Sequence, residues 1–438
     1  MSNIKVGVSR ICITPPLGTP LSGYFEPRYT SGVHDELYAT AVAFDDGKSK
    51  AVVISLDLCG LKNQWWLDDC KKMISDYCQI PIEAIIVTCS HTHTGPIVGP
   101  DIKDSGADSN KSYDNFLMLC IRDAAFGALA DVKASKFYIA ENNVDDLAFC
   151  RIFRMKDGSV RTNPGVCNPD ILHPLAEPNE QLTLVKIIRE DAEDIILVNF
   201  GVHADCIGGD VISADWPGVM RDTIESVYPD AFCVFLQGCE GDLNTTNVKG
   251  MIHGKGFARA ASNGHRIAGA VIQVLDDARE ISLENIAFAN KTIFIPTNQE
   301  NHRLDEARRI VELHRQERDD EIEDDGSGIT TIVSEAIRII DLENGPEEFK
   351  FNLSAIRIGD IAIVGLPGEP FLEIGKRIIE NSPFEKTLIC VLTDGGEIYF
   401  PTTFVIGEGG YEARSSVVKK GADDIIVNNA LELLNELK

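Results

Sequence analysis

Two histidines stand two residues apart in the segment "CSHTHTGP" (residues 89–96), close behind the apolar run "AIIV". In an extended chain the side chains of His91 and His93 point to the same face, because the side-chain direction alternates with a period of two. Both rings can therefore reach one metal site, or one can bind while the other assists. A polar turn that caps the following segment is the alternative that this motif leaves open.

Other residues of ligand type also follow apolar runs. His203 ends "ILVNFGVH", where a hydrogen-bonded polar turn is again the simpler interpretation. Glu369 lies in "IVGLPGEP", where its alternative role is to cap the next helix near the positive end of the helix dipole. Tyr399 and Tyr411 flank a glycine-rich loop and have the character of lid residues.

Histidine nitrogen and carboxylate oxygen are ligands that zinc accepts, and a catalytic zinc site leaves one position for water. Bound zinc lowers the pKa of that water to about 7, which creates a nucleophile at neutral pH. Two histidines and a glutamate from separate strands meet this need, although iron or manganese suits a similar set of ligands. The sequence contains no GxSxG elbow, no GxxxxGK[ST] loop and no GxGxxG after a strand, so the competing nucleophile and nucleotide-binding motifs are missing.

Short β-rich runs alternate with helical patterns along the chain, which predicts the α/β class with layered mixed sheets flanked by helices. The runs "AVVISLDL" and "DIILVNFGV" are apolar without alternation, as expected of strands that are covered on both faces. Sites in such folds collect at the carboxyl ends of strands, where five segments carry ligand-type residues. We expect one catalytic domain over 1–438 with a helical insertion at about 298–346. The expected strands are 37–45, 50–57, 84–88, 136–142, 183–189, 195–201, 232–237, 286–295, 349–356, 360–365 and 387–392, and the expected helices are 63–79, 112–130, 216–227, 254–277, 300–320, 370–381 and 422–437.

The formal net charge of −27 disfavours nucleic acid and anionic membrane surfaces as partners and points to a small-molecule substrate. No apolar run reaches the ~18 residues of a membrane-spanning helix, so we expect no membrane insertion. The N-terminal segment lacks the features of a secretion signal, and the twelve cysteines show no paired spacing. These features predict a cytoplasmic protein with reduced thiols and leave its oligomeric state open.

Taken together, the motifs resemble the neutral, non-lysosomal ceramidase family, specifically its N-terminal catalytic domain. "SHTHTGP" resembles the family signature "THTHSGP", and "NFGVHADC" resembles its second histidine segment. "LPGEPF" resembles "PGEF", and "YFPTTFVIGEGGYEA" resembles the family's tyrosine-rich segment, with the outer tyrosines twelve residues apart. The opening "GVSRICITPPLGTPLSGYF", the segment "SADWPG" and "FLQGCEGDLN" also match in order, so the resemblance runs from about residue 5 to the C-terminus.

The resemblance implies one Zn²⁺ per chain, held by His91, His203, Glu369 and Tyr399. It further implies that His93 contacts the reacting carbonyl group and that Tyr411 faces the oxyanion. Arg151, in "FCRIFRM", matches an active-site arginine loosely, and Arg154 and Arg161 compete for that role.

Several residues around this set are assigned less directly. Asn244, in "GDLNTT", replaces the family's serine and is a candidate substrate-binding residue together with His34. Asp57 is a candidate partner for a ligand histidine, and Asp215 and Asp242 are expected to shape loops around the metal. We expect no counterpart of the family's C-terminal sandwich domain or of its secretion signal.

The sequence thus predicts a zinc-dependent, ceramidase-like hydrolase that cleaves an amide (N-acyl) bond of a small, soluble substrate. A role in sphingolipid metabolism, with ceramide itself as substrate, is the less favoured form of this hypothesis. One alternative is a zinc hydrolase of another carbonyl bond, such as an ester, or of a sugar derivative. A second is a non-catalytic metal- or ligand-binding homologue, because the family's serine is replaced.

Overall fold

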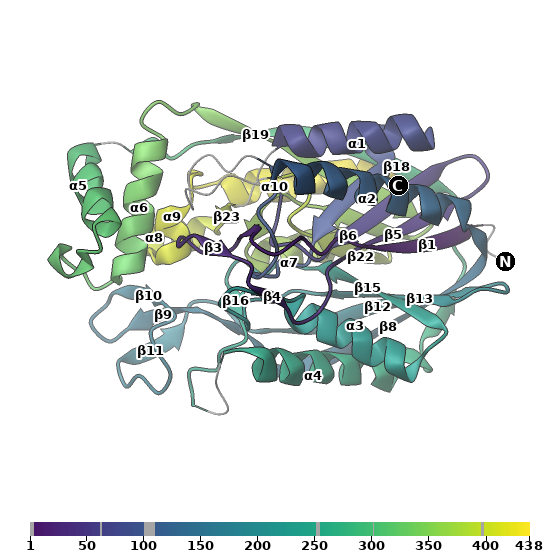
Figure 1. The fold of residues 1–438 in the computed structure, drawn as a ribbon, viewed down its shortest axis with the longest axis horizontal. Helices are drawn as coiled ribbons and strands as arrows, with labels where there is room; N and C mark the ends of the chain where they lie inside the picture. Colours follow the sequence, from purple (N-terminus) through teal and green to yellow (C-terminus); the bar gives the residue numbers. More distant parts are fainter. Residues whose placement is uncertain (1–3, 62–63, 100–109, 251–254, 301, 396–397) are drawn as a thin grey trace.

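Two β-sheets form the centre of the molecule (Figure 1). The computed structural model describes residues 4–61, 64–99, 110–250, 255–300, 302–395 and 398–438. The pairs β6–β7, β13–β15 and β20–β22 are parallel and the remaining neighbours are antiparallel, so both sheets are mixed. The large sheet has the order β15(Ala231–Gln237), β13(Asp194–Phe200), β12(Asn179–Arg189), β8(Lys133–Cys150), β1(Lys5–Cys12), β5(Tyr38–Asp45), β6(Lys50–Leu56) and β7(Ile85–Cys89), with β16(Leu243–Asn244) and β17(Arg279–Ile281) paired to β8; the small sheet has the order β18(Ile286–Pro296), β19(Glu348–Ile358), β20(Ile361–Gly365) and β22(Lys386–Cys390).

The two sheets pack face to face and helices cover their outer faces. In β6, Val53 points toward the core shared with the small sheet, whereas Val52 and Ile54 point to the helical side. The same division separates Ile195 from Ile196 in β13. Alternating side chains are thus buried on both faces, as the uninterrupted apolar runs predicted, and the layered α/β class is confirmed. The covering helices are α1(Gln64–Cys78) and α2(Lys111–Ala130), α3(Asp215–Val227) and α4(Phe257–Leu275) on the large sheet, and α7(Leu372–Asn381) and α10(Ala422–Leu437) on the small one.

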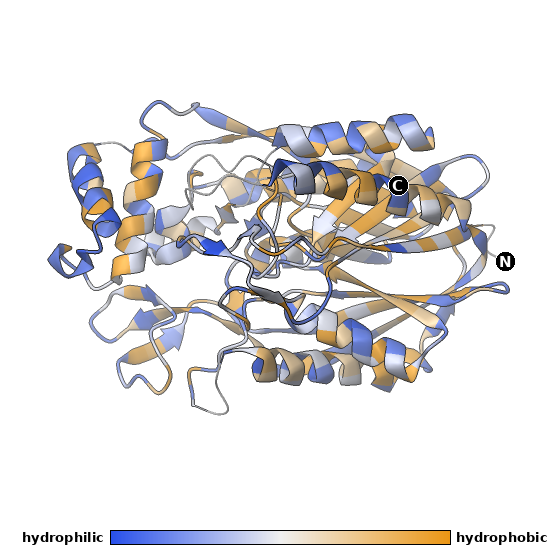
Figure 2. Ribbon diagram, viewed as in Figure 1, coloured by the Kyte–Doolittle hydropathy of each residue, from blue (hydrophilic) through white to orange (hydrophobic). Residues whose placement is uncertain are grey.

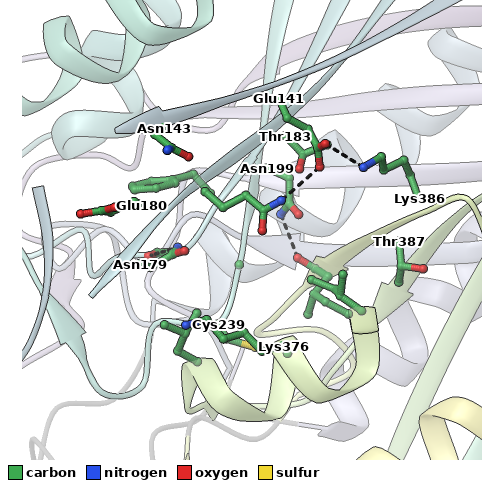
Figure 3. A pocket seen from close by; sticks show the side chains of 18 of the residues that line it. Glu141, Asn143, Asn179, Glu180, Thr183, Asn199, Cys239, Lys376, Lys386 and Thr387 are labelled. Atoms are coloured by element: carbon green, nitrogen blue, oxygen red, sulfur yellow. Dashed lines mark hydrogen bonds and ion pairs between the residues drawn. The ribbon is translucent and has the colours of Figure 1, made fainter. Parts of the chain in front are cut away.

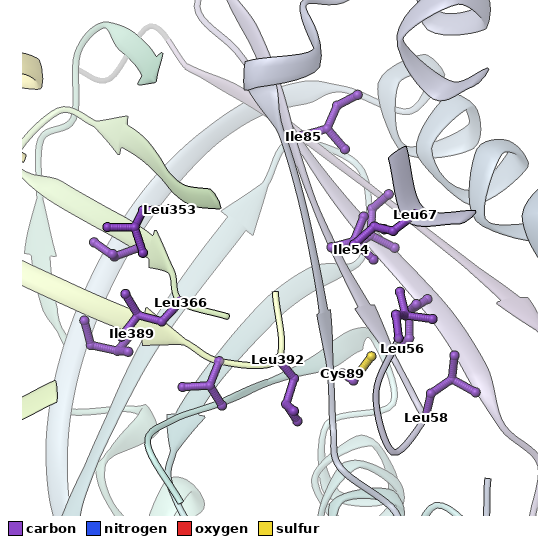
Figure 4. Packing of buried hydrophobic residues seen from close by; sticks show 14 of the residues in the cluster. Ile54, Leu56, Leu58, Leu67, Ile85, Cys89, Leu353, Leu366, Ile389 and Leu392 are labelled. Carbon is purple, nitrogen blue, oxygen red and sulfur yellow. The ribbon is translucent and has the colours of Figure 1, made fainter. Parts of the chain in front are cut away.

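Apolar side chains fill the spaces between these layers, while the polar helix faces turn outward (Figure 2). Figure 4 shows one core cluster, in which Ile54 and Leu56 of β6 belong to the same group as Leu67 of α1, Leu353 of β19 and Ile389 of β22. All five are almost completely buried, and burying one such side chain contributes about 1.5–3 kcal/mol. This packing fixes the strand ends that carry the candidate site.

Residues 298–346 lie between β18 and β19 and form two helices, α5(Leu304–Arg315) and α6(Ile329–Asp341), joined through the short 3₁₀ turn η2(Asp319–Glu321). The predicted helix 300–320 is therefore shorter than expected, and a second helix follows it. Both pack around their own apolar cluster, at the end of the molecule away from the N-terminus in Figure 1. α6 also contacts α9(Tyr411–Ser415), which follows α8(Thr403–Glu408) in the tyrosine-rich segment.

Short strand pairs complete the description. They are β9(Ile152–Met155) with β10(Val160–Thr162) and β11(Ile171–Pro174), β2(Pro20–Leu21) with β3(Arg28–Tyr29), β4(Gly32–Val33) with β14(Val211–Ile212), and β21(Glu369–Pro370) with β23(Tyr399–Phe400); η1(Ile82–Ala84) is a 3₁₀ turn before β7. Among the described helices, none has both the length and the apolar character needed to cross a membrane.

Candidate metal centre and active site

Three residues from three separate strand ends meet in one buried group. His91 follows β7, His203 follows β13, and Glu369 follows β20. Their ligand atoms all lie within 4.8 Å of one another. The Oε2 atom of Glu369 is 3.2 Å from Nε2 of His203 and 3.5 Å from Nε2 of His91. The structure therefore brings together three of the four residues predicted as zinc ligands in a compact donor set.

Hydrogen bonds between the two sheets hold these strand ends together. The Val391 amide, just after β22, donates to the carbonyl of Gln237 at the end of β15 (2.9 Å). The Thr88 hydroxyl of β7 donates to the carbonyl of Val391 (2.7 Å). Asn199 of β13 donates to Ile389 of β22 (2.9 Å). The ends of β7, β13 and β22 are thus fixed relative to one another by bonds that are independent of any ligand.

Backbone carbonyl groups orient both histidine rings. Nδ1 of His91 lies 2.8 Å from the carbonyl oxygen of Cys59, and Nδ1 of His203 lies 3.0 Å from that of Glu240. Each Nδ1 therefore donates its proton to a carbonyl, and each Nε2 is turned toward Glu369, which is the orientation of metal-binding histidines.

Asp57, which the sequence suggested as a partner of a ligand histidine, has another role in the structure. Its Oδ2 accepts hydrogen bonds from Arg221 (2.7 Å) and from the Tyr38 amide (3.0 Å). Because the Asp57 and Arg221 side chains are both buried, this carboxylate is committed to neutralising the arginine. The prediction for Asp57 is therefore wrong: carbonyl groups perform the orientation instead.

The chemistry of the donor set fits a divalent cation. Glu369 is buried, and its Oε2 has no hydrogen-bond partner within the described part of the chain although it faces two imidazole nitrogens. A buried carboxylate oxygen without a partner is costly unless a cation compensates it. Cys59, His91 and His93 form a second, overlapping group, with Sγ of Cys59 3.9 Å from Nδ1 of His91.

The metal-free site has an uneven distribution of protons. Burial lowers the pKa of His91, but the Glu369 carboxylate and Cys59 outweigh burial and raise it well above its usual value. Burial raises the pKa of Glu369, and the two imidazoles reverse this effect, so its pKa lies well below the usual range. Burial and the Arg151 charge lower the pKa of His203 to about 4. His91 thus carries the proton beside an ionised Glu369.

His93 borders the group from the same loop as His91. Its Nε2 lies 3.2 Å from Nε2 of His91, and its Nδ1 lies 3.7 Å from Oδ1 of Asp205. Burial lowers the pKa of His93 to about 3 despite this carboxylate, so the ring is neutral. Asp205 in turn accepts a hydrogen bond from Tyr24, whose ring contacts His93 edge-on.

Strand pairing places Tyr399 beside the group, because β21 and β23 align Glu369 with Tyr399 in parallel register. The ring of Tyr411, the first residue of α9, lies edge-on to Tyr399 at 5.8 Å between centroids. Burial, followed by the Glu369 charge, raises the pKa of Tyr399 well above its usual value. Burial and the neighbouring Glu412 raise the pKa of Tyr411 to about 12, so both phenols are protonated in the metal-free site.

Arg151 borders His203 and contacts protein groups with each part of its guanidinium. Nη1 is 3.3 Å from Nε2 of His203, Nη2 donates to the Gly241 carbonyl (2.7 Å), and Nε pairs with Glu412 (2.8 Å). Its guanidinium carbon also lies 5.2 Å from the centroid of the Tyr399 ring. Of the three candidate arginines Arg151 is the one at the centre, while Arg154 pairs with Glu408.

Asp215 and Asp242 accept hydrogen bonds from backbone amides that follow two residues of the group. Oδ2 of Asp215 accepts from the amides of Cys206 and Ile207, which follow His203 (2.9 and 2.8 Å). Oδ1 of Asp242 accepts from the amide of Leu372, three residues after Glu369 (2.8 Å). Burial raises the pKa of each carboxyl to about 6.

The two candidate substrate-binding residues have described contacts with residues outside the three-residue group. The His34 side chain is 52% exposed, pairs with Asp35 (2.8 Å) and stacks on Phe257. The Asn244 amide donates to Asn163 (2.5 Å). Neither contact joins them to the centre, and their contact with substrate remains a prediction.

Sequence reasoning missed two buried acidic residues, Glu240 and Glu412. Both are 0% exposed. Glu412 pairs with Arg151 and accepts from Thr162 (2.6 Å), and its only signal in the sequence is its position next to Tyr411. Glu240 lies in "FLQGCEGDLN", a segment that carries part of the resemblance, but nothing in the spacing singles it out.

A separate cavity of about 760 Å³ lies between β8, β12 and α7 (Figure 3). Its walls carry polar side chains such as Asn179, Thr183 and Asn199, and the Glu141–Lys386 ion pair spans it at 2.7 Å. None of the residues of the three-residue group lines this cavity. It is therefore distinct from the candidate metal centre.

Comparison with solved structures reveals the same fold in neutral ceramidases. The crystal structure of neutral ceramidase from Pseudomonas aeruginosa matches with a TM-score of 0.71 and 16% sequence identity over 99% of this chain and 74% of that chain. A ceramidase complexed with C2 matches with a TM-score of 0.74 and 14% identity over 99% of this chain and 75% of that chain. No family model matches the chain, and no curated protein matches it. The fold expected from the resemblance is confirmed.

Proposed function

We propose that the chain is a zinc-dependent hydrolase that cleaves an amide bond in a small substrate. The observation that carries this proposal is the buried group of His91, His203 and Glu369, whose donor types and spacing suit one catalytic zinc ion. The ceramidase-like fold supports the same reaction class. Tyr399, aligned with Glu369 by strand pairing, is the fourth residue that would hold the metal.

When bound, zinc polarises a carbonyl group and lowers the pKa of a water molecule. The protein side chains then stabilise and orient. His93, neutral and next to His91, donates a hydrogen bond to the carbonyl oxygen as negative charge develops on it. The pKa of Tyr411 is about 12, so its phenol is protonated at neutral pH and supplies a second donor. A donor of this type contributes about 3–4 kcal/mol to the transition state.

Arg151 acts as a positioning residue in this proposal. Its guanidinium is occupied by Glu412 and the Gly241 carbonyl and borders both His203 and Tyr399. It therefore holds those two side chains in place rather than contacting the substrate. This role gives specific content to the loose match with an active-site arginine that the sequence showed.

The substrate class can be tested with the zinc-loaded protein on matched pairs of short-chain N-acyl amides and esters, together with a short-chain ceramide. We expect hydrolysis of an N-acyl amide that is lost in His91→Ala. Hydrolysis confined to the esters would move the assignment to another carbonyl bond. Binding of zinc without turnover on the whole panel would favour the non-catalytic alternative, which the replacement of the family's serine by Asn244 motivates.

A further inference from the structure

A cavity of about 460 Å³ lies where the helical insertion meets the tyrosine-rich segment. It is lined by residues of α6, α8 and α9, whose positions can be followed in Figure 1, and by the residues that come after α9. Its volume falls in the range of small-molecule sites, about 300–1,000 Å³. The charged residues that line it are Glu300, Glu335, Arg338, Arg414, Lys419 and Lys420.

The lining of this cavity has an excess of positive charge. Four of the charged side chains are basic and two are acidic, in a chain whose formal net charge is −27. A concave surface lined by one sign of charge concentrates ions of the opposite sign. The cavity therefore attracts anions, although the chain as a whole repels them.

Arg338 brings a buried guanidinium to the cavity. The residue is 4% exposed, and its Nε and Nη1 donate to the carbonyl groups of Arg414 (2.8 Å) and Asn298 (3.0 Å). These carbonyls orient the guanidinium without neutralising its charge. Its ion pair with Glu335 spans 3.9 Å, which is too long for a hydrogen bond. Arg338 thus keeps N–H donors that the described protein groups do not use.

Glu335 compensates Arg338 weakly because three arginines share it. Its Oε2 accepts hydrogen bonds from Arg303 (3.0 Å) and from Arg414 (2.5 Å). Arg414 has a second carboxylate partner in Asp325, at 2.9 Å. Among the arginines that line the cavity, Arg338 is therefore the one with the least compensation.

Two lysines that follow α9 add further positive charge. Lys419 and Lys420 are exposed, and no ion pair joins either of them to an acidic side chain within the described ranges. The second acidic residue of the lining, Glu300, lies 3.2 Å from His302 and is itself half exposed. Arg338 and the two lysines together form a cationic group that the neighbouring carboxylates leave available.

We propose that this cavity binds a small anion through a phosphate or carboxylate group. The Arg338 guanidinium and the ammonium groups of Lys419 and Lys420 donate charge-assisted hydrogen bonds to its oxygen atoms. The bound anion links α6 of the insertion to the segment that contains α9. This inference goes beyond the proposed function and does not depend on the zinc centre.

Isothermal titration calorimetry of the full chain with inorganic phosphate and with succinate tests the proposal. The metal-free chain is used in chloride buffer, so that the anion cannot coordinate a metal ion. We expect at least one of the two anions to bind, and the tighter one identifies which group the cavity prefers. Succinamide, the neutral diamide of succinate, should not bind. The bound anion should raise the thermal midpoint, because a ligand of the folded state stabilises it.

The double variant Lys419→Gln/Lys420→Gln locates the site. Both side chains are exposed, so the variant should fold, and we expect its affinity for the anion to fall about tenfold or more, since hydrogen bonds to charged groups are lost. Lys133→Gln/Lys136→Gln is the matched control: it removes the same charge from exposed positions of β8 and should bind the anion like wild type.

Arg338→Lys provides a further measurement inside the cavity. It keeps the charge and loses the planar set of donors, so it should also bind the anion more weakly. The inference would be overturned if wild type bound neither phosphate nor succinate, or bound succinamide as tightly as succinate. Unchanged affinity in Lys419→Gln/Lys420→Gln, or an equal loss in the control, would overturn it as well. None of these results bears on zinc binding, so the proposed function stands or fails separately.

Discussion

The buried ion pair between Arg151 and Glu412 provides a quantitative test of how the site is held together. The pair spans 2.8 Å, with 9% of the arginine and 0% of the glutamate side chain exposed. Replacing one partner leaves the other charge buried without compensation, which costs about 3–5 kcal/mol. We therefore expect Arg151→Met and Glu412→Gln each to lower the free energy of unfolding by about this amount. The double variant should lose less than the sum, with a coupling energy of about 2–3 kcal/mol.

Urea denaturation of the metal-free protein at neutral pH measures all four corners of this cycle. The hydrogen bond from Arg151 to the Gly241 carbonyl is lost in both the single and the double variant, so it cancels in the coupling energy. The matched control is the surface pair Lys72–Asp76, which has the same 2.8 Å distance but side chains 68% and 69% exposed. That pair should couple far more weakly, because water and salt screen the two exposed charges. A coupling energy for Arg151 and Glu412 as small as that of the surface pair would refute the reasoning from burial.

Three further predictions follow from the same geometry. His93→Ala should retain zinc and lose about 10²–10³-fold in kcat, which is the cost of losing one oxyanion donor. Steady-state kinetics measure this loss, and full activity of the variant on the true substrate would exclude the role. Zinc binding near pH 7 should release about one proton, because the raised pKa of His91 keeps its ring protonated without metal. The zinc affinity should therefore fall about tenfold per pH unit as the pH drops below that pKa. Calorimetry in buffers of different ionisation enthalpy measures the proton release, and the absence of any release would contradict this prediction. Gly241→Ala should reduce zinc content by metal analysis, because a Cβ there would lie 2.3 Å from the Glu369 carbonyl oxygen, whereas Gly269→Ala in α4, with nothing within 4 Å, should retain full zinc content.

The sequence predicted the strands and the three-residue group well, for a physical reason. Uninterrupted apolar runs such as that of β6 reflect burial on both faces, and polar residues at the ends of such runs are local features that spacing reveals. His91, His203 and Glu369 were found in this way, and the resemblance added Tyr399, which the strand register places beside Glu369.

The parts that the sequence missed depend on contacts between distant segments. The groups that orient His91 and His203 are carbonyls of Cys59 and Glu240, and a backbone acceptor has no signature in the sequence. Asp57 is paired with Arg221, 164 residues away, which no local pattern reveals. The predicted helix 300–320 ended early because the chain turns at Asp319–Glu321 and folds back as α6.

The central claim is that His91, His203 and Glu369 form one metal centre, and metal analysis of the purified chain tests it most directly. Wild type should contain about one zinc per chain after zinc loading and dialysis, and His91→Ala and His203→Ala should contain almost none. His173→Ala is the matched control, since its exposed ring lies 2.8 Å from the neighbouring Pro174 carbonyl oxygen, and its zinc content should equal that of wild type. Zinc-free wild type after loading, or variants at His91 and His203 that keep the metal, would contradict the account.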